Sequence, residues 1–128
     1  MPKVSRESAT LGGDFGPVFD RAEDLDGYRI NFTLFRENVD GTPLVKGLKD
    51  DMCQCPHWGY VMTGKVTFRF PDHDEVYETG DAFYTPPGHI PLAHEPGSEV
   101  VMFSPADEMA VTEAQIIKNF QAMQAANA

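Results

Sequence analysis

Hydrophobic and polar residues alternate along the middle of the chain. Every second residue from Tyr28 to Leu34 is hydrophobic, which is the period of a β-strand with one buried face. The same reasoning predicts short strands at 60–63, 66–70, 75–78, 82–85, 90–93 and 99–104, between turns rich in glycine and proline. Short strands at such regular spacing predict an all-β sandwich or barrel.

The chain before and between these strands is less regular. Residues 1–14 are polar and interrupted by glycines, so we expect a loose arm there, followed by a helical turn at 20–25. Asp40 and Gly41 are typical of a hairpin turn, with a returning segment at 42–45.

The last part of the chain has a helical period. Thr112 and Gln115 match a capping box, and four hydrophobic residues then fall on one helical face. These four are Ile116, Ile117, Phe120 and Met123. They predict a helix from about Glu113 to Ala125 that packs on the sheet or on a second subunit. The predicted organisation, within a single domain, is an N-terminal arm (1–27), a barrel (28–106) and a C-terminal helix (107–128).

The composition is that of one globular domain. The chain has 128 residues, 41% of them hydrophobic, and a formal net charge of −10 from 20 acidic and 10 basic residues. This negative charge disfavours nucleic acids and anionic membrane surfaces as partners. No hydrophobic run is long enough to span a membrane, and the N-terminus lacks the apolar stretch of a signal peptide. We therefore expect a cytoplasmic protein.

The two cysteines of the chain, Cys53 and Cys55, precede His57 at intervals of two residues. In an extended segment such side chains share one face, so two sulfurs and an imidazole would converge. A disulfide between the cysteines is disfavoured, because parallel side chains on one strand face lie about 7 Å apart. Thiolate and imidazole ligands together are typical of a divalent metal, Zn²⁺ first, with Fe²⁺, Ni²⁺ or Mn²⁺ as alternatives.

Other residues extend or oppose this interpretation. His89, after a Pro-Pro-Gly turn, would supply a fourth ligand. Asp51 is an optional ligand whose simpler interpretation is a solvated loop carboxylate. His94 has the opposite strand parity from His89, which predicts that it faces solvent or the far side of the sheet. The alternative to a metal site is that the cysteines are small buried hydrophobic residues and His57 is hydrogen-bonded in the barrel.

Two groups of residues carry the spacing of known motifs. Six residues separate His57 from Gly64, and a strand, a turn and a second strand follow. The second group is Gly80, Pro86 and Gly88. With these spacings residues 45–104 resemble a small single-domain cupin. The resemblance implies an all-β fold, a double-stranded β-helix or jelly-roll barrel, here with a C-terminal α-helix.

The chain departs from the cupin pattern at the metal ligands. His57 stands at the position of the usual glutamate. The usual His-x-His pair falls on Asp51 and Cys53, or on Cys53 and Cys55 with a one-residue gap. Pro91 stands where the histidine of the second motif is expected. The metal ligands predicted for this chain are Cys53, Cys55, His57 and His89.

Two functions remain open. The first is a metal-dependent enzyme of the oxygenase, isomerase or hydrolase type, acting on a small molecule inside the barrel. The second is a non-catalytic binding or sensing module in which a closed Cys/His zinc site is structural. The number of ligands separates the two, because a catalytic metal keeps an open position.

Two further expectations concern surfaces. Strand parity predicts an apolar interior, to which Phe32, Phe68, Phe83 and Met102 contribute. The apolar stripe of the C-terminal helix and the strand from Tyr28 offer spare surface, so we expect a homodimer.

Overall fold

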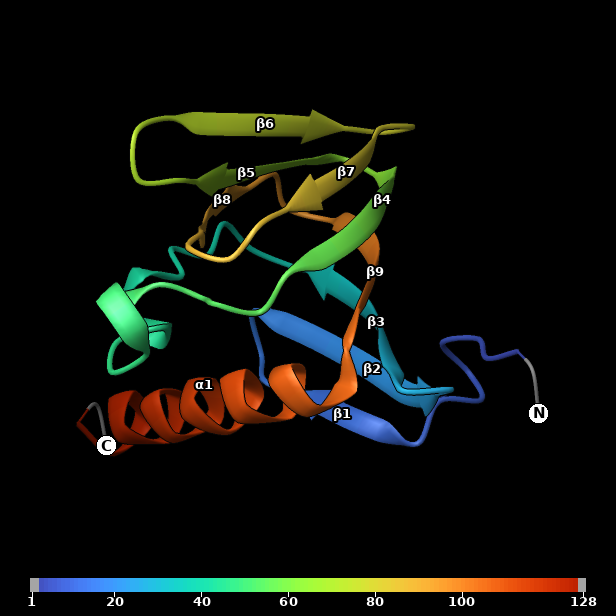
Figure 1. Cartoon of the computed structure of the whole chain (residues 1–128), viewed down its shortest axis with the longest axis horizontal. Coiled ribbons are helices and arrows are strands. Elements are labelled where there is room, and N and C mark those ends of the chain that lie inside the picture. The colour runs from blue at the N-terminus through green and yellow to red at the C-terminus, as the bar shows by residue number, and fades with distance from the viewer. Residues whose placement is uncertain (1–2, 127–128) are drawn as a thin grey trace.

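The computed structural model describes residues 3–126, which form two antiparallel β-sheets and one long helix (Figure 1). The large sheet has the strand order β1 (Leu11–Asp14), β2 (Val18–Leu25), β3 (Tyr28–Phe35), β9 (Ser98–Pro105), β4 (His57–Thr63) and β7 (Ala82–Thr85). The small sheet has the order β6 (Asp74–Glu78), β5 (Lys65–Arg69) and β8 (Ile90–His94). The remaining elements are two 3-10 turns, η1 (Thr42–Leu44) and η2 (Lys49–Asp51), and helix α1 (Ala106–Ala126). The predicted all-β fold with a C-terminal helix is confirmed.

The inner faces of the two sheets pack on one apolar core. Its buried members come from both sheets: Phe35, Val61, Val66, Phe68, Phe70, Phe83, Val100 and Met102. Gly59 on β4 makes this packing possible, because a Cβ atom there would lie 2.3 Å from the ring of Phe83. The strands thus hold together through alternate side chains directed between the sheets.

Three predictions for the first half of the chain were wrong. Residues 11–14, expected in a loose arm, form β1, which pairs with β2. Residues 20–25 are not a helical turn but part of β2, which pairs with β3 along its whole length. Asp26 and Gly27 both have positive φ angles, 49° and 82°, and form the tight turn between these strands. The segment 42–45 does not return as a strand: η1 lies there, where the chain leaves the large sheet.

Helix α1 begins earlier than its sequence pattern indicates. It follows β9 without a loop, and the Ala106 N–H donates a hydrogen bond to the Gly27 carbonyl (2.9 Å). Thr112 therefore lies inside the helix, where it is buried, and does not cap it. Acidic residues in the first turn, Asp107 and Glu108, suit the positive end of the helix dipole.

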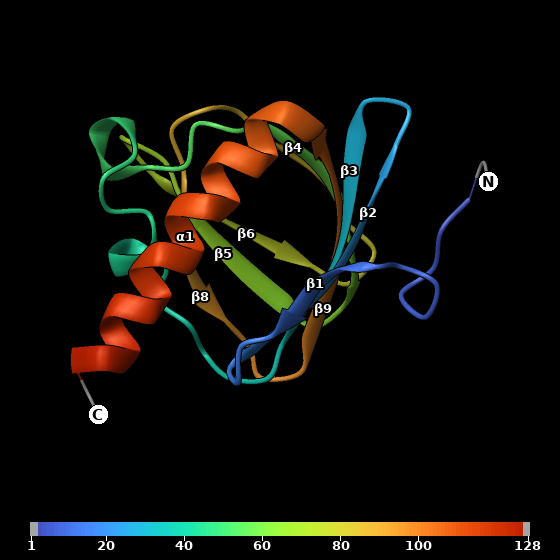
Figure 2. The ribbon, with the colours of Figure 1, turned by 90° about the horizontal axis from the view of Figure 1, so that it is seen from below.

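The helix closes one end of the space between the sheets. Seen from below, α1 runs diagonally across that end (Figure 2). Met109 packs in a second apolar cluster with Val45 and Ile90. Farther along, the side-chain amide of Asn119 donates to the carbonyls of Leu44 and Lys46 (2.7 Å each). These contacts place α1 as one wall of the barrel interior.

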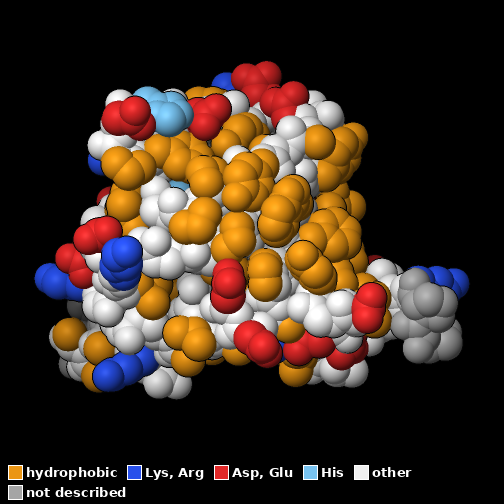
Figure 3. Space-filling model, in the orientation of Figure 1, with side chains coloured by type: hydrophobic (Ala, Val, Ile, Leu, Met, Phe, Trp, Pro, Cys, Tyr) orange, Lys and Arg blue, Asp and Glu red, His pale blue; other side chains and the backbone are white. Residues whose placement is uncertain are grey.

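The opposite face of the large sheet carries exposed hydrophobic side chains, which we call the outer apolar face. Its half-exposed members are Tyr28, Trp58, Tyr60, Met62, Tyr84 and Phe103. In Figure 3 hydrophobic atoms gather over β4, β7 and β9.

In the described part of the chain, no helix has the length and apolar character needed to cross a membrane.

Candidate metal centre

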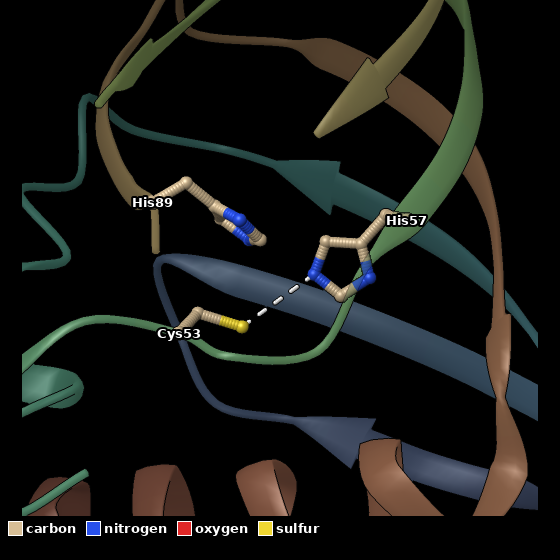
Figure 4. Close-up of side chains that lie close together, drawn as sticks. All are labelled: Cys53, His57 and His89. Atoms are coloured by element: carbon tan, nitrogen blue, oxygen red, sulfur yellow. Dashed lines mark hydrogen bonds between the residues drawn. The ribbon is translucent and has the colours of Figure 1, made fainter. Parts of the chain in front are cut away.

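Cys53, His57 and His89 come together inside the barrel (Figure 4). One sulfur and two imidazole nitrogens lie within 4.8 Å of one another, and all three residues are buried. The Sγ atom of Cys53 lies 3.6 Å from Nε2 of His57. Three donor atoms of the kinds that bind divalent metals therefore share one small space.

The backbone explains why Cys53 meets His89. The Cys53 N–H donates to the carbonyl of His89 (2.8 Å), and the Gly88 N–H donates to the carbonyl of Cys53 (2.8 Å). This isolated bridge joins the segment before β4 to the segment before β8. His57 is the first residue of β4 in the large sheet, and His89 immediately precedes β8 in the small sheet, so the three side chains meet where the two sheets approach each other.

Hydrogen bonds orient both imidazoles. Nδ1 of His89 donates to the carbonyl of Pro86 (2.8 Å), because a carbonyl oxygen can only accept. Nδ1 of His57 contacts the Ser104 hydroxyl (2.7 Å), which leaves Nε2 on the side of Cys53. A partner on the far nitrogen is typical of metal-binding histidines, because it fixes the ring and its tautomer.

Burial governs the protonation of the three residues. It lowers the pKa of His57 to about 3 and also lowers the pKa of His89, so both rings are neutral near neutral pH. Burial raises the pKa of the Cys53 thiol to about 11, so this thiol is protonated in the free protein and binding a metal would release its proton. Such a thiol is a poor nucleophile, which argues against cysteine catalysis.

The structure does not bring Cys55 into this group. The chain bends at Cys55 and becomes a strand only at His57, so strand alternation does not extend back through it. Its buried thiol instead contacts the Pro56 carbonyl (3.6 Å). Asp51 also lies apart: it is exposed, and its carboxylate accepts the Gly47 N–H (2.9 Å). Three of the four predicted ligands are therefore together.

A cavity of about 600 Å³ opens beside the three donors and extends to α1. This volume is typical of small-molecule sites. Most of its wall is apolar and includes Phe35, Phe68, Met102, Ile116 and Phe120. The cavity is therefore large and apolar enough to hold an organic molecule against the donor atoms.

Of the four residues predicted to face the interior, one points the other way. Phe68 and Met102 line the cavity, and Phe83 packs in the core. On β3, however, Asn31 and Thr33 are on the inner face, so Phe32 lies on the outer face. The hydrophobic side of this strand points out of the barrel and its polar side points in.

The inward polar side chains form a network that the sequence analysis missed. Asp20 on β2 accepts hydrogen bonds from the Thr33 hydroxyl (2.9 Å) and from Nδ2 of Asn31 (3.0 Å). The same Nδ2 donates to Glu113 on α1 (3.0 Å), which also pairs with Arg29. Desolvation raises the pKa of Asp20 to about 6. The sequence signal that could have revealed this network is the set of polar residues, Asn31 and Thr33 among them, that alternate with the hydrophobic residues from Tyr28 to Leu34.

His94 is on the cavity wall and not on the outside, so that prediction was wrong. The pairing of β5 with β8 shifts by one residue after Thr67, which leaves Leu92 as an extra residue in β8. Such a bulge reverses the alternation of the residues beyond it. The His94 ring stacks on Phe35, with ring centroids 3.7 Å apart and planes at 15°. Burial lowers its pKa to about 4, so the ring is neutral.

Comparison with known proteins identifies the class of fold. No family model matches the chain, and no curated protein sequence matches it. Among solved structures, the polyketide cyclase RemF from Streptomyces resistomycificus is similar at 15% identity, with 82% of this chain and 79% of that chain covered and a TM-score of 0.57.

Two further solved structures agree with this result. An RmlC-like cupin from Shewanella frigidimarina shares 16% identity over 82% of this chain and 95% of its own, with a TM-score of 0.53. KdgF from a Halomonas species shares 21% identity over 70% and 82%, with a TM-score of 0.52. Likeness at these identities establishes the fold, and the chain has the fold of a small cupin.

Proposed function

We propose that this protein is a metal-dependent enzyme that acts on a small molecule in the barrel cavity. Cys53, His57 and His89 would hold the metal. The observation that carries the proposal is that three buried donor atoms lie within 4.8 Å of one another on the wall of a cavity of about 600 Å³.

The number of donors supports an enzyme over a structural site. A structural zinc ion is held by four protein ligands, whereas a catalytic one is held by three and keeps a position open for water or substrate. Cys55, the residue needed for a closed Cys/His site, lies outside the group. The alternative, a non-catalytic module with a structural zinc, would need Cys55 to turn toward the other three residues.

The donor set favours Zn²⁺. One thiolate and two imidazoles suit this borderline metal, while Fe²⁺ and Ni²⁺ accept similar ligands and Mn²⁺ prefers oxygen. When bound, the metal would supply Lewis-acid polarisation of a substrate oxygen. The chain itself would contribute orientation, through Pro86 and Ser104 behind the two histidines, and exclusion of water by the apolar wall.

Elemental analysis of protein purified without a His-tag tests this proposal. We expect about one metal ion per chain in the wild type and in Cys55→Ser, and loss of the metal in Cys53→Ser. The two variants make the same chemical change two residues apart, so Cys55→Ser is the matched control. Wild-type protein without metal would refute the proposal. Equal loss of metal in both variants would favour the closed structural site.

We also propose that the protein is a homodimer joined through the outer apolar face. Six half-exposed hydrophobic side chains lie on one sheet face, and Tyr28, Trp58 and Tyr84 pack against one another there, which is typical of an interaction surface. The hydrophobic face of α1 contributes less to a dimer interface than its sequence suggests, because Ile116 and Phe120 line the cavity. Sedimentation of the 14.2 kDa chain as a monomer at micromolar concentration would exclude this dimer.

We also propose that the protein is located in the cytoplasm. Both cysteines are free and buried, which is typical of a reducing compartment. Cell fractionation that finds the protein outside the cytoplasm would refute it.

A further inference from the structure

Two buried polar groups on the cavity wall lack hydrogen-bond partners among the described residues. Both ring nitrogens of His94 are unpartnered, although only 3% of the residue is exposed. The Oδ1 atom of Asn31 is also unpartnered, with 2% of that residue exposed. Buried polar atoms are almost always hydrogen-bonded, so these groups indicate a molecule that fills the cavity.

The chemistry of these atoms restricts that molecule. The Nδ2 atom of Asn31 faces the carboxylates of Asp20 and Glu113, which can only accept from it when ionised, so the free atom is the acceptor Oδ1. Its partner must therefore donate a hydrogen bond. A neutral imidazole at His94 offers one donor and one acceptor, and a hydroxyl group can serve both roles.

The charges beside Asn31 disfavour anions there. Asp20 and Glu113 supply two carboxyl groups, and the nearby cation, Arg29, is already paired with Asp24 and Glu113. A carboxylate or phosphate would bring only acceptors to Asn31 and would be repelled by the carboxylates. The rest of the wall is apolar and rich in phenylalanine, including Phe15, Phe35, Phe68 and Phe120.

We propose that the cavity binds a neutral ring compound with a hydroxyl group, of the phenol class, whose hydroxyl is anchored by the His94 ring. The proposal rests on the proposed function, because it assigns the substrate class of the same cavity. The hydroxyl pairs with a nitrogen of the neutral His94 ring, and the aromatic ring of the ligand lies among the phenylalanine side chains.

Binding of 2-naphthol and 2-naphthoate to chelator-treated protein, measured by calorimetry near neutral pH, tests this assignment, because a metal ion held by Cys53, His57 and His89 would itself attract the carboxylate. The two probes share one ring system and differ in carrying a neutral hydroxyl or a carboxylate. We expect the wild type to bind 2-naphthol at least about tenfold more tightly than 2-naphthoate. Equal or tighter binding of the naphthoate would overturn the proposal, as would absence of 2-naphthol binding.

The variant His94→Phe tests the anchor. Phenylalanine can keep the stacking on Phe35 but cannot hydrogen-bond, so we expect about tenfold weaker 2-naphthol binding. The matched control is His73→Phe, which changes an exposed turn histidine and should leave binding unchanged. Unchanged binding in His94→Phe would contradict the proposal.

Thermal unfolding separates a ligand-binding role for His94 from a structural one. If its nitrogens serve a ligand, His94→Phe should unfold at the same temperature as the wild type or higher, because it removes unpartnered buried polar atoms. A large drop in unfolding temperature would indicate a structural role and contradict the assignment.

Titrations with a chelator and with added zinc distinguish this proposal from the proposed function. Selective 2-naphthol binding by protein that never takes up metal would support the ligand class and refute the metal enzyme. Stoichiometric metal without any preference for 2-naphthol would do the reverse.

Discussion

The two faces of the large sheet carry opposite kinds of side chain. On β4, His57 points into the barrel and is buried, while the next residue, Trp58, is half exposed on the outer apolar face. On β3, Asn31 lines the cavity while Tyr28 lies half exposed. The face that encloses the cavity is thus partly polar, and the face that looks outward is apolar.

This contrast shows that burial in the barrel and hydrophobicity are separate properties here. The inner face carries polar residues such as Asp20 and the buried Thr33, which are hydrogen-bonded to each other. The outer face carries half-exposed aromatic and aliphatic side chains, which is why we propose that a second copy of the chain covers it. Changes on one face should therefore leave the function of the other intact.

The largest effect is expected from removing a proposed metal ligand on the inner side. The substitution His89→Ala deletes one of three donors, so the affinity for zinc should fall at least about a hundredfold. Competition with a chromophoric chelator measures this loss, with His73→Ala as the surface control. The sedimentation coefficient should not change. Wild-type zinc affinity in His89→Ala would remove this residue from the site.

A charge on the outer apolar face should affect only assembly. In Tyr60→Asp an ionised carboxylate would be buried in the dimer, so the dissociation constant should rise at least about thirtyfold. The matched control is Val76→Asp, which alters an exposed residue of β6 on the small sheet. Analytical ultracentrifugation provides the comparison, with metal content measured on the same samples. Equal dissociation in both variants would mean that the outer apolar face has no special role.

Asp20 should give the inner face a characteristic dependence of stability on pH. Its pKa is raised to about 6 in the folded protein from the ordinary value of 3.8, so the folded state binds this proton more tightly than the unfolded state. Its contribution to stability is therefore present below about pH 4 and is lost as the pH rises to about 6.

The variant Asp20→Asn removes this titration. It should raise the free energy of unfolding at neutral pH by about 2 kcal/mol and flatten the decline between about pH 4 and 6. Urea unfolding at several pH values measures both quantities. A pH profile parallel to that of the wild type would show that Asp20 does not cause the decline.

The smallest effect is expected behind the proposed metal site. In Ser104→Ala, His57 loses the partner of its Nδ1 atom, so the ring is less well oriented and zinc affinity should fall about tenfold. The control Ser5→Ala changes a serine near the N-terminus, away from the cavity. A loss as large as that of His89→Ala would show that Ser104 does more than orient the ring.

Local patterns were sufficient for much of the fold. The strands at and after Tyr28 were identified because alternation and glycine or proline turns are properties of short segments. Residues 20–25 were wrongly predicted as a helical turn because hydrophobic and polar residues do not alternate regularly in β2. Two polar residues, Asp20 and Arg21, are adjacent there, and pairing with β3 determines the extended conformation.

The candidate site was predicted in composition but not in detail. Cys53, His57 and His89 were named because unusual residue types cluster around the cupin-like spacings. Cys55 was included because extended geometry was assumed through a segment that bends. His94 was placed outside because a bulge of one residue in β8 leaves no clear mark in the sequence.

The sequence by itself determined the class of fold, the closing helix and three residues that could bind a metal, because periodicity, turn chemistry and residue type are local. Only the tertiary structure decided which face of each strand points inward and that His89 meets Cys53. The same holds for Glu113 on the helix, which reaches Asn31 across the cavity. Pairing between segments that are distant in the sequence determines these contacts. It also determines the inward face of each strand, because the alternation of hydrophobic and polar residues has the same appearance whichever side is buried.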